Sequence, residues 1–138
     1  LLESRGLGDV YKRQPYDQIR NVSGAQRIGG AIFNVELDNT HPVAYGYGKT
    51  HPIFRRGTAF FKLSDAPAAN VGRYTSSPLI SGYISEEKLD EMKNTASIIS
   101  KKQDSGRIIM FADNPAFRAF WYGTHGLLMN AILFGKAF

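Results

Sequence analysis

Two runs of β-forming residues around a short turn restrict the fold of this chain more than any other feature of its sequence. Residues 95–101 and 107–112 flank the turn Gln103-Asp104-Ser105-Gly106. Runs of this kind on either side of a D-S-G turn predict a β-hairpin. Residues 108–112 are apolar at five successive positions, which predicts a central strand buried on both faces.

Other strand signals are shorter. Alternation of apolar and polar residues predicts a half-buried strand over residues 31–38, in which Phe33, Val35 and Leu37 face the core. Residues 58–63 and 71–74 are bounded by turn residues and are also predicted as strands. The stretch 45–57 is rich in glycine and aromatic residues and is predicted as a loop.

Helix signals occur at four places. His41-Pro42 opens a short helix with proline in its first turn, and Ser85 is a predicted N-cap before two acids. Asn114-Pro115 begins a helical segment that runs through Trp121, and a last helix covers about residues 124–134 before Gly135. Several strands with few helices favour an α/β or α+β sheet domain.

The composition excludes several classes of protein. The 138 residues are 43% hydrophobic and 21% charged, as in folded globular domains. No apolar run approaches the roughly 18 residues that a membrane span needs. The absence of cysteine removes disulfides, thiolate metal sites and a cysteine nucleophile. The net charge of +5 permits an anionic partner.

The first fourteen residues are interpreted as foreign to the natural protein. Ser4 to Gln14 read SRGLGDVYKRQ, which resembles the translation, in one reading frame, of a transposon adapter used to prepare sequencing libraries. Segments of this kind are excluded from fold reasoning, as tags are. We therefore divide the chain into an adapter-derived segment (1–14), a loop or linker (15–28) and a domain (29–138) truncated at its N-terminal side. Without the first segment the net charge is +4.

Familiar catalytic motifs are missing or incomplete. Gly48-Lys49-Thr50 lacks the first glycine of a phosphate-binding loop, and no serine lies in a G-x-S-x-G turn. The histidines at positions 41, 51 and 125 have no zinc-binding spacing, so each is predicted to be structural or at the surface. Basic residues are scattered rather than interleaved with exposed aromatics, so no nucleic-acid partner is expected.

The candidate ligand-binding residues lie in the aromatic-rich segment 111–123. In open α/β sheets, ligands bind beyond the carboxyl ends of the strands, which is where Asp113, Asn114 and Arg118 would stand. The alternative, which we favour, is that Asp113 and Asn114 cap a helix while the aromatic residues at 117, 120 and 121 complete the core.

Four stretches of the chain resemble a known family. They are residues 30–48, 54–57, 77–84 and 106–124, and the string DNPAFRAFWYGT at 113–124 is the most specific. Together they resemble the C-terminal region of bacterial zinc carboxypeptidase-like proteins of the carboxypeptidase A superfamily. In that family a catalytic domain is followed by a domain similar in fold to class I glutamine amidotransferases.

The resemblance implies a partial flavodoxin-like, amidotransferase-like sheet with flanking helices. It also implies a parent metallopeptidase, exported from a bacterial cell, whose zinc lies in the missing catalytic domain. No position here matches the family's H-x-x-E motif, so no catalytic, metal or cofactor residue is carried over. The expected partner is the catalytic domain of the same parent chain.

Three functions are therefore considered. The first is a non-catalytic accessory domain of a zinc carboxypeptidase-like protein. The second is a stand-alone basic module that binds an acidic partner through the residual positive charge. The third is an unrecognised hydrolase that uses Asp113, His125 or His41.

Overall fold

The computed structural model describes residues 27–135. The predicted adapter-derived segment and most of the predicted loop 15–28 lie outside the described residues. The described elements, in chain order, are β1 (Ile28–Leu37), η3 (Pro42–Ala44), β2 (Thr50–Gly57), η4 (Pro67–Ala69), β3 (Asn70–Gly82), α1 (Glu86–Met92), β4 (Ala96–Gln103), β5 (Gly106–Phe111), η5 (Phe117–Ala119), η6 (Tyr122–Thr124) and α2 (His125–Phe134). In this part of the chain no helix is long and apolar enough to cross a membrane.

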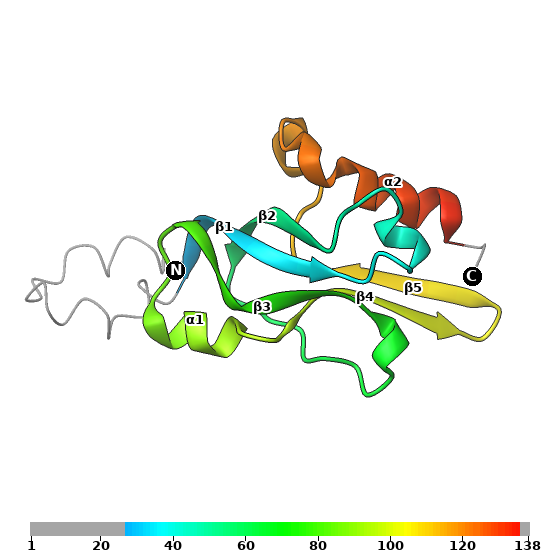
Figure 1. Cartoon of the computed structure of the whole chain (residues 1–138), viewed down its shortest axis with the longest axis horizontal. Coiled ribbons are helices and arrows are strands. Elements are labelled where there is room, and N and C mark those ends of the chain that lie inside the picture. Colours follow the sequence, from blue (N-terminus) through cyan, green and yellow to red (C-terminus); the bar gives the residue numbers. More distant parts are fainter. Residues whose placement is uncertain (1–26, 136–138) are drawn as a thin grey trace, which may run out of the picture.

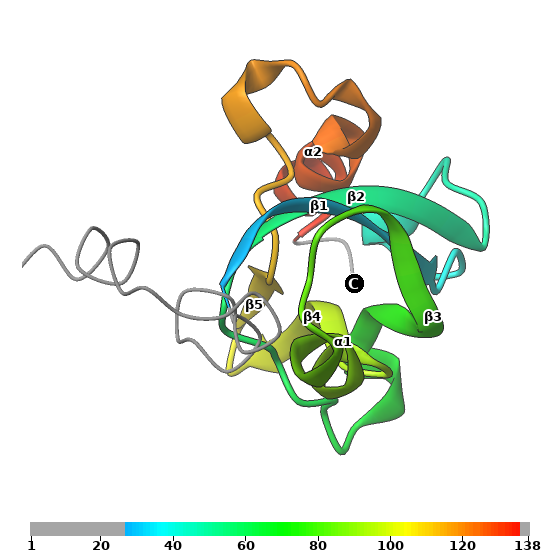
Figure 2. The ribbon, with the colours of Figure 1, turned by 90° about the vertical axis from the view of Figure 1, so that its left-hand side faces the viewer.

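The five strands form one curled sheet in the order β2-β1-β3-β4-β5 (Figure 1). In the turned view of Figure 2, β1, β2 and β3 arch over β4 and β5. The predicted mixture of sheet and helices is confirmed. The flavodoxin-like arrangement is not confirmed, because all four strand ladders of residues 27–135 are antiparallel whereas a flavodoxin-like sheet is parallel.

The predicted hairpin is confirmed as β4 and β5, whose register runs from Gln103↔Gly106 to Ile98↔Phe111. The prediction that its second strand is central was wrong, because β5 lies at one edge of the sheet. Ile109 and Phe111 pack against the core, whereas Ile108 and Met110 on the other face are 49% and 39% exposed. A continuous apolar run therefore did not mean burial on both faces.

The predicted loop 45–57 was wrong in its second half, because residues 50–57 form β2 at the opposite edge of the sheet. Proline cannot donate to a strand ladder and is tolerated in edge strands, which explains Pro52 in β2. The strand predicted at 58–63 was also wrong, since it is reduced to an isolated bridge between Phe61 and Ala96.

The third strand, β3, is longer than the predicted run 71–74, and its pairing with β1 is irregular. Its register against β1 changes between Phe33↔Leu79 and Val35↔Tyr74, so extra residues of β3 bulge out of the ladder. Near its end, Gly82 has a φ of +101°, and a Cβ there would lie 2.7 Å from the Cβ of Ala31. Only glycine allows this close approach of β3 to β1.

The two α-helices begin where the sequence predicts. The Ser85 side chain accepts a hydrogen bond from Lys88 N at the start of α1. Helix α2 has no such N-cap side chain; instead Leu127 N donates to the Tyr47 hydroxyl at 3.2 Å, and that hydroxyl donates to Gly123 O at 2.9 Å. The predicted helix from Asn114 to Trp121 was wrong, because only one short turn of 3-10 helix, η5, forms there.

Candidate functional site

Asp113 lies just after β5 with its carboxylate buried inside the curled sheet. The side chain is 8% exposed. The Tyr74 hydroxyl donates to both of its oxygens, at 2.8 Å and 2.7 Å, and Ser97 Oγ donates to Oδ2 at 3.0 Å. Arg55 Nη1 donates to Oδ1 at 3.0 Å. We call Arg55, Tyr74, Ser97 and Asp113 the buried cluster.

Arg55 reaches this cluster because it follows Ile53 on the inward face of β2. Both side chains are buried, and that of Arg55 is 1% exposed. Its Nη1 also donates to Tyr74 Oη at 3.0 Å and to Ala112 O at 3.1 Å, and its Nη2 donates to Ala59 O. A buried guanidinium is tolerated only with partners of this kind, because desolvation of a lone charge costs far more than folding supplies.

The buried cluster connects the two edges of the sheet. Arg55 belongs to β2 at one edge, and Asp113 follows β5 at the other. Tyr74, on the central strand β3, stands between them and contacts both. An ion pair and a shared hydroxyl therefore join two sheet edges that no strand ladder joins.

Burial decides the electrostatics of the cluster. It raises the pKa of Asp113 above its usual value, against the opposing effects of Arg55, Tyr74 and Ser97. Burial also raises the pKa of Tyr74 well above its usual value, and the neighbouring Asp113 charge adds to that rise. Tyr74 therefore stays protonated and remains a hydrogen-bond donor to the carboxylate.

The structure does not bring the three candidate ligand residues together. Asp113 is buried in the cluster and does not cap a helix, contrary to the favoured interpretation. Asn114 is exposed, and its Oδ1 accepts from Ala116 N at 3.0 Å in a local turn. Arg118 is exposed, has a φ of 50° and lies over the Phe117 ring at 5.3 Å.

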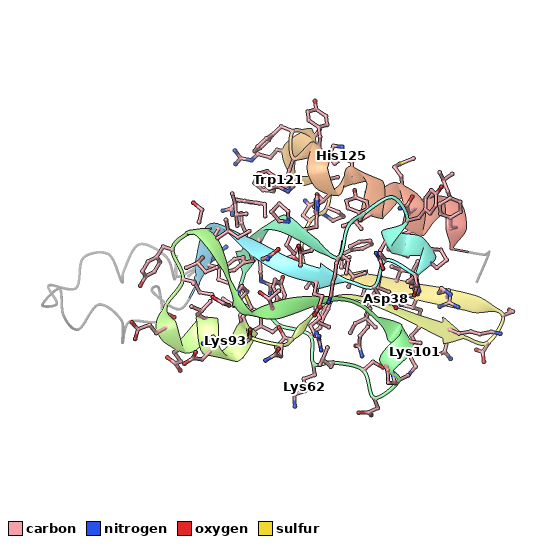
Figure 3. All side chains as sticks on the ribbon, viewed as in Figure 1. Asp38, Lys62, Lys93, Lys101, Trp121 and His125 are labelled. Carbon is pink, nitrogen blue, oxygen red and sulfur yellow. The ribbon has the colours of Figure 1, made fainter. Side chains whose placement is uncertain are left out.

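The aromatic residues of segment 111–123 differ in whether they pack on the sheet or face solvent. Phe117 packs on Phe54 of β2 with ring centroids 4.4 Å apart, and Trp121 packs on the same ring at 6.0 Å. Phe120 is exposed, so the prediction that it completes the core was wrong. In Figure 3, Trp121 and His125 lie together on the side of the sheet where α2 packs.

The three histidines occupy separate environments. His41 Nδ1 accepts from Val43 N at 3.2 Å and caps η3, and burial is the main cause that lowers its pKa. His51 packs edge-on against Tyr47, with ring centroids 4.9 Å apart, and burial lowers its pKa also. His125 packs on Tyr122 at 5.3 Å. No group of three or more metal-ligating side chains is found within residues 27–135.

An open pocket lies at the end of β1, away from the buried cluster. Its volume is about 580 Å³, within the range of small-molecule sites. It is lined by Glu36, Leu37, Asp38, Asn39, Lys49, Leu63, Ser64, Pro67, Asn70 and Arg73. Glu36 is paired with Arg73 at 2.6 Å and with Lys49 at 3.3 Å, and these hydrogen bonds lower its pKa. The charged groups of the pocket therefore largely neutralise one another.

Sequence reasoning missed Arg55, Tyr74 and Ser97. The signal for Arg55 was its place two residues after Ile53, which becomes visible only when β2 is recognised as a strand. No local sequence pattern pointed to Tyr74 or Ser97, because the pairing of the strands in the sheet is what brings each of them to Asp113.

Comparisons with protein-family models, curated proteins and solved structures found no match to this chain.

Proposed function

We propose that the chain is a non-catalytic accessory domain of a zinc metallocarboxypeptidase-like protein. The non-catalytic part of the proposal rests on Asp113, whose two oxygens accept hydrogen bonds from Arg55, Tyr74 and Ser97 inside the sheet. The link to a zinc carboxypeptidase-like parent rests on the resemblance of the string at 113–124. A general base must reach a substrate proton within hydrogen-bond distance. The Asp113 carboxylate is instead engaged in hydrogen bonds that connect two sheet edges, which is a structural role.

The proposed partner is the catalytic domain that the family resemblance places before this one. A domain that precedes this one would connect to it through β1. The first part of β1 pairs with the end of β3 through Ala31↔Gly82. Ile80 and Tyr83, at this end of β3, are 54% and 57% exposed. Exposed apolar side chains beside the joining segment suit a contact with a neighbouring domain. We propose that the preceding domain covers them.

The finer fold that the resemblance implies has no support in the described strands. A flavodoxin-like or amidotransferase-like sheet would need parallel strands, and the strands of residues 27–135 supply only antiparallel ladders. The alternative of a basic module for an acidic partner has weaker support. Lys88 and Lys93 are each paired with an acid of α1, so part of the positive charge is already neutralised.

Three measurements test the proposed function. The upstream reading frame of the source DNA should encode a zinc carboxypeptidase domain, and the purified chain should release no C-terminal amino acid from peptides, with or without added zinc. In the joined protein, Ile80→Asp should lower the melting temperature, because the variant places a charge in the domain contact. Peptidase activity of the chain alone, or an upstream frame without a catalytic domain, would refute the proposal.

A further inference from the structure

The start of α2 is tied to the sheet through Tyr47, which precedes β2, and His51, which is the second residue of β2. The Tyr47 hydroxyl donates to Gly123 O at 2.9 Å and accepts from Leu127 N at 3.2 Å. The His51 ring packs edge-on against Tyr47 and lies against Gly123, where an added Cβ would be 3.3 Å from His51 Nε2. We call residues 121–127, which include η6 and the first residues of α2, the latch.

Three ring nitrogens at this junction are buried without a hydrogen-bond partner in the protein. They are His51 Nε2, Trp121 Nε1 and His125 Nε2, and the only other such side-chain atom within residues 27–135 is Arg55 Nε. A buried polar group that lacks a partner has lost the hydrogen bonds that it would make to water. Opening of the latch returns these nitrogens to water, so this junction costs less to open than one whose polar groups are all paired.

The sheet side of the junction carries no counter-charge for a protonated His51. In the ladder with β1, His51 pairs with Val35, and Glu36, as the next residue of β1, points to the opposite face. Glu36 is paired there with Lys49. Tyr47 faces the His51 ring directly, and burial raises the pKa of Tyr47, so this side chain stays protonated and neutral.

The latch side carries no counter-charge either. Residues 119–135 contain no Asp, Glu, Lys or Arg, and the titratable side chains among them are Tyr122 and His125, whose rings pack on each other. Burial lowers the pKa of His51, and the Gly123 backbone acts in the opposite direction. The Gly123 carbonyl already accepts from Tyr47, so a proton on His51 would have to share this acceptor.

We propose that protonation of His51 opens the latch, so that the start of α2 detaches from β2 in mild acid. An imidazolium ring carries a proton on both nitrogens, and Nε2 of His51 is buried against the latch without an acceptor of its own. Opening restores the ordinary histidine pKa of 6.5, so the open state binds the proton more tightly than the closed state. The closed latch is therefore stable above pH 6.5, and below it opening is favoured by up to about tenfold per pH unit.

An open latch uncovers part of β2. Trp121 packs on the Phe54 ring with centroids 6.0 Å apart, so its release exposes a side of the strand that the closed latch covers. The second half of α2 keeps a separate anchor, because Asn130 Nδ2 donates to Val43 O at 3.0 Å and to Tyr45 O at 2.8 Å. The opening is therefore local, at the end of α2 that adjoins η6 (Figure 1). The inference goes beyond the proposed function, because it concerns a different surface and needs no catalytic domain.

Hydrogen exchange of the full chain, followed by NMR, tests the latch. The Leu127 amide reports on it, because this amide donates to the Tyr47 hydroxyl. The Leu89 amide of α1, which donates to Ser85 O at 2.9 Å, is the internal control. Between about pH 7.5 and about pH 5, the protection factor of Leu127, corrected for the intrinsic pH dependence of exchange, should fall on the order of tenfold, while that of Leu89 stays unchanged. Equal losses at both amides, or no loss at Leu127, would overturn the inference.

Two variants separate His51 from the other histidine of the junction. His51→Gln keeps a polar side chain of similar size but cannot take up the proton, so protection at Leu127 should no longer change over this range of pH. His125→Gln is the matched control and should keep the wild-type change. A pH dependence that survives in His51→Gln, or that is lost in His125→Gln, would contradict the assignment.

The imidazole NMR signals of the wild-type chain give a readout that does not depend on whether either variant folds. The His51 ring should titrate over the same range of pH in which the Leu127 amide loses protection, because one proton drives both changes. Titration of His51 with full protection retained at Leu127 would show that the ring takes up its proton without opening the latch, and would refute the proposal.

Discussion

Replacing Asp113 with asparagine removes one charge from the buried cluster while keeping its shape. The Tyr74 and Ser97 hydroxyls can still donate to an amide oxygen at the Oδ2 position, whereas the amide NH2 then faces Arg55 Nη1, which loses both its counter-charge and this acceptor. That guanidinium is 1% exposed and cannot turn to water without opening the sheet. The variant therefore leaves a buried guanidinium without its ion-pair partner.

The expected loss follows from burial. Removing one partner of a buried ion pair destabilises by about 3–5 kcal/mol, because the other charge stays desolvated. Domains of this size unfold with a free energy of about 5–15 kcal/mol, so Asp113→Asn should leave the chain folded but much less stable. Arg55→Met should cost a similar amount, because it leaves the carboxylate unpaired and the two sheet edges unjoined.

Urea unfolding followed by circular dichroism measures these losses. The double variant Arg55→Met/Asp113→Asn should be clearly less destabilised than the sum of the two single variants, with a coupling of about 2 kcal/mol. Arg73→Met is the control, because it removes a pair with Glu36 that is largely exposed and should lose about 1 kcal/mol or less. Single-variant losses below about 1 kcal/mol, or additive effects, would refute the view that the cluster joins the sheet edges.

Three further predictions concern other parts of the fold. Tyr47→Phe removes the hydroxyl that caps α2 and should destabilise the chain by about 1 kcal/mol, with faster hydrogen exchange at the Leu127 amide as the diagnostic readout; unchanged exchange would speak against the cap. Gly82→Ala should destabilise by about 1–3 kcal/mol in the same urea assay, because the new Cβ would meet Ala31 at a positive φ, whereas Gly29→Ala meets nothing and should be far milder. Stability should also fall as pH drops through 6.5, the ordinary histidine pKa, because burial lowers the pKa of His41 and His51 in the folded state and the unfolded chain then binds protons first. That pH dependence should shrink in His51→Gln, and an equal slope in the variant would contradict the assignment.

Sequence patterns correctly predicted the elements that are determined by residues close together in the chain. The hairpin of β4 and β5 follows from its turn, and α1 begins where Ser85 accepts from Lys88 N. The strand β1 follows from the alternation of Phe33, Val35 and Leu37, all of which are buried. In each case the residues that determine the structure lie within one element or one turn.

Predictions were wrong where the outcome depends on distant segments that pair or pack with the element. The apolar run in β5 predicted a central strand, but a strand becomes central only when a second neighbour pairs with it, and β5 has one. Pro52 and the nearby glycines led to the prediction of a loop where β2 forms. Proline is compatible with a strand whose one edge stays unpaired, and β2 is such an edge strand. The helix predicted after Asn114-Pro115 did not form, since Arg118 and Ala119 adopt positive φ values of 50° and 53° that place Phe117 on β2.

The sequence by itself determined the hairpin, the Ser85 cap of α1, the alternating face of β1 and the absence of thiol chemistry, because these need only residues close together in the chain or the composition alone. It also singled out Asp113 without indicating its role. Only the tertiary structure decided that role, by bringing Asp113 to Arg55 across 58 positions of sequence and closing both oxygens inside the sheet. Whether a carboxylate is exposed for chemistry or buried in a structural pair depends on what the distant strands place around it, and no local pattern contains that information.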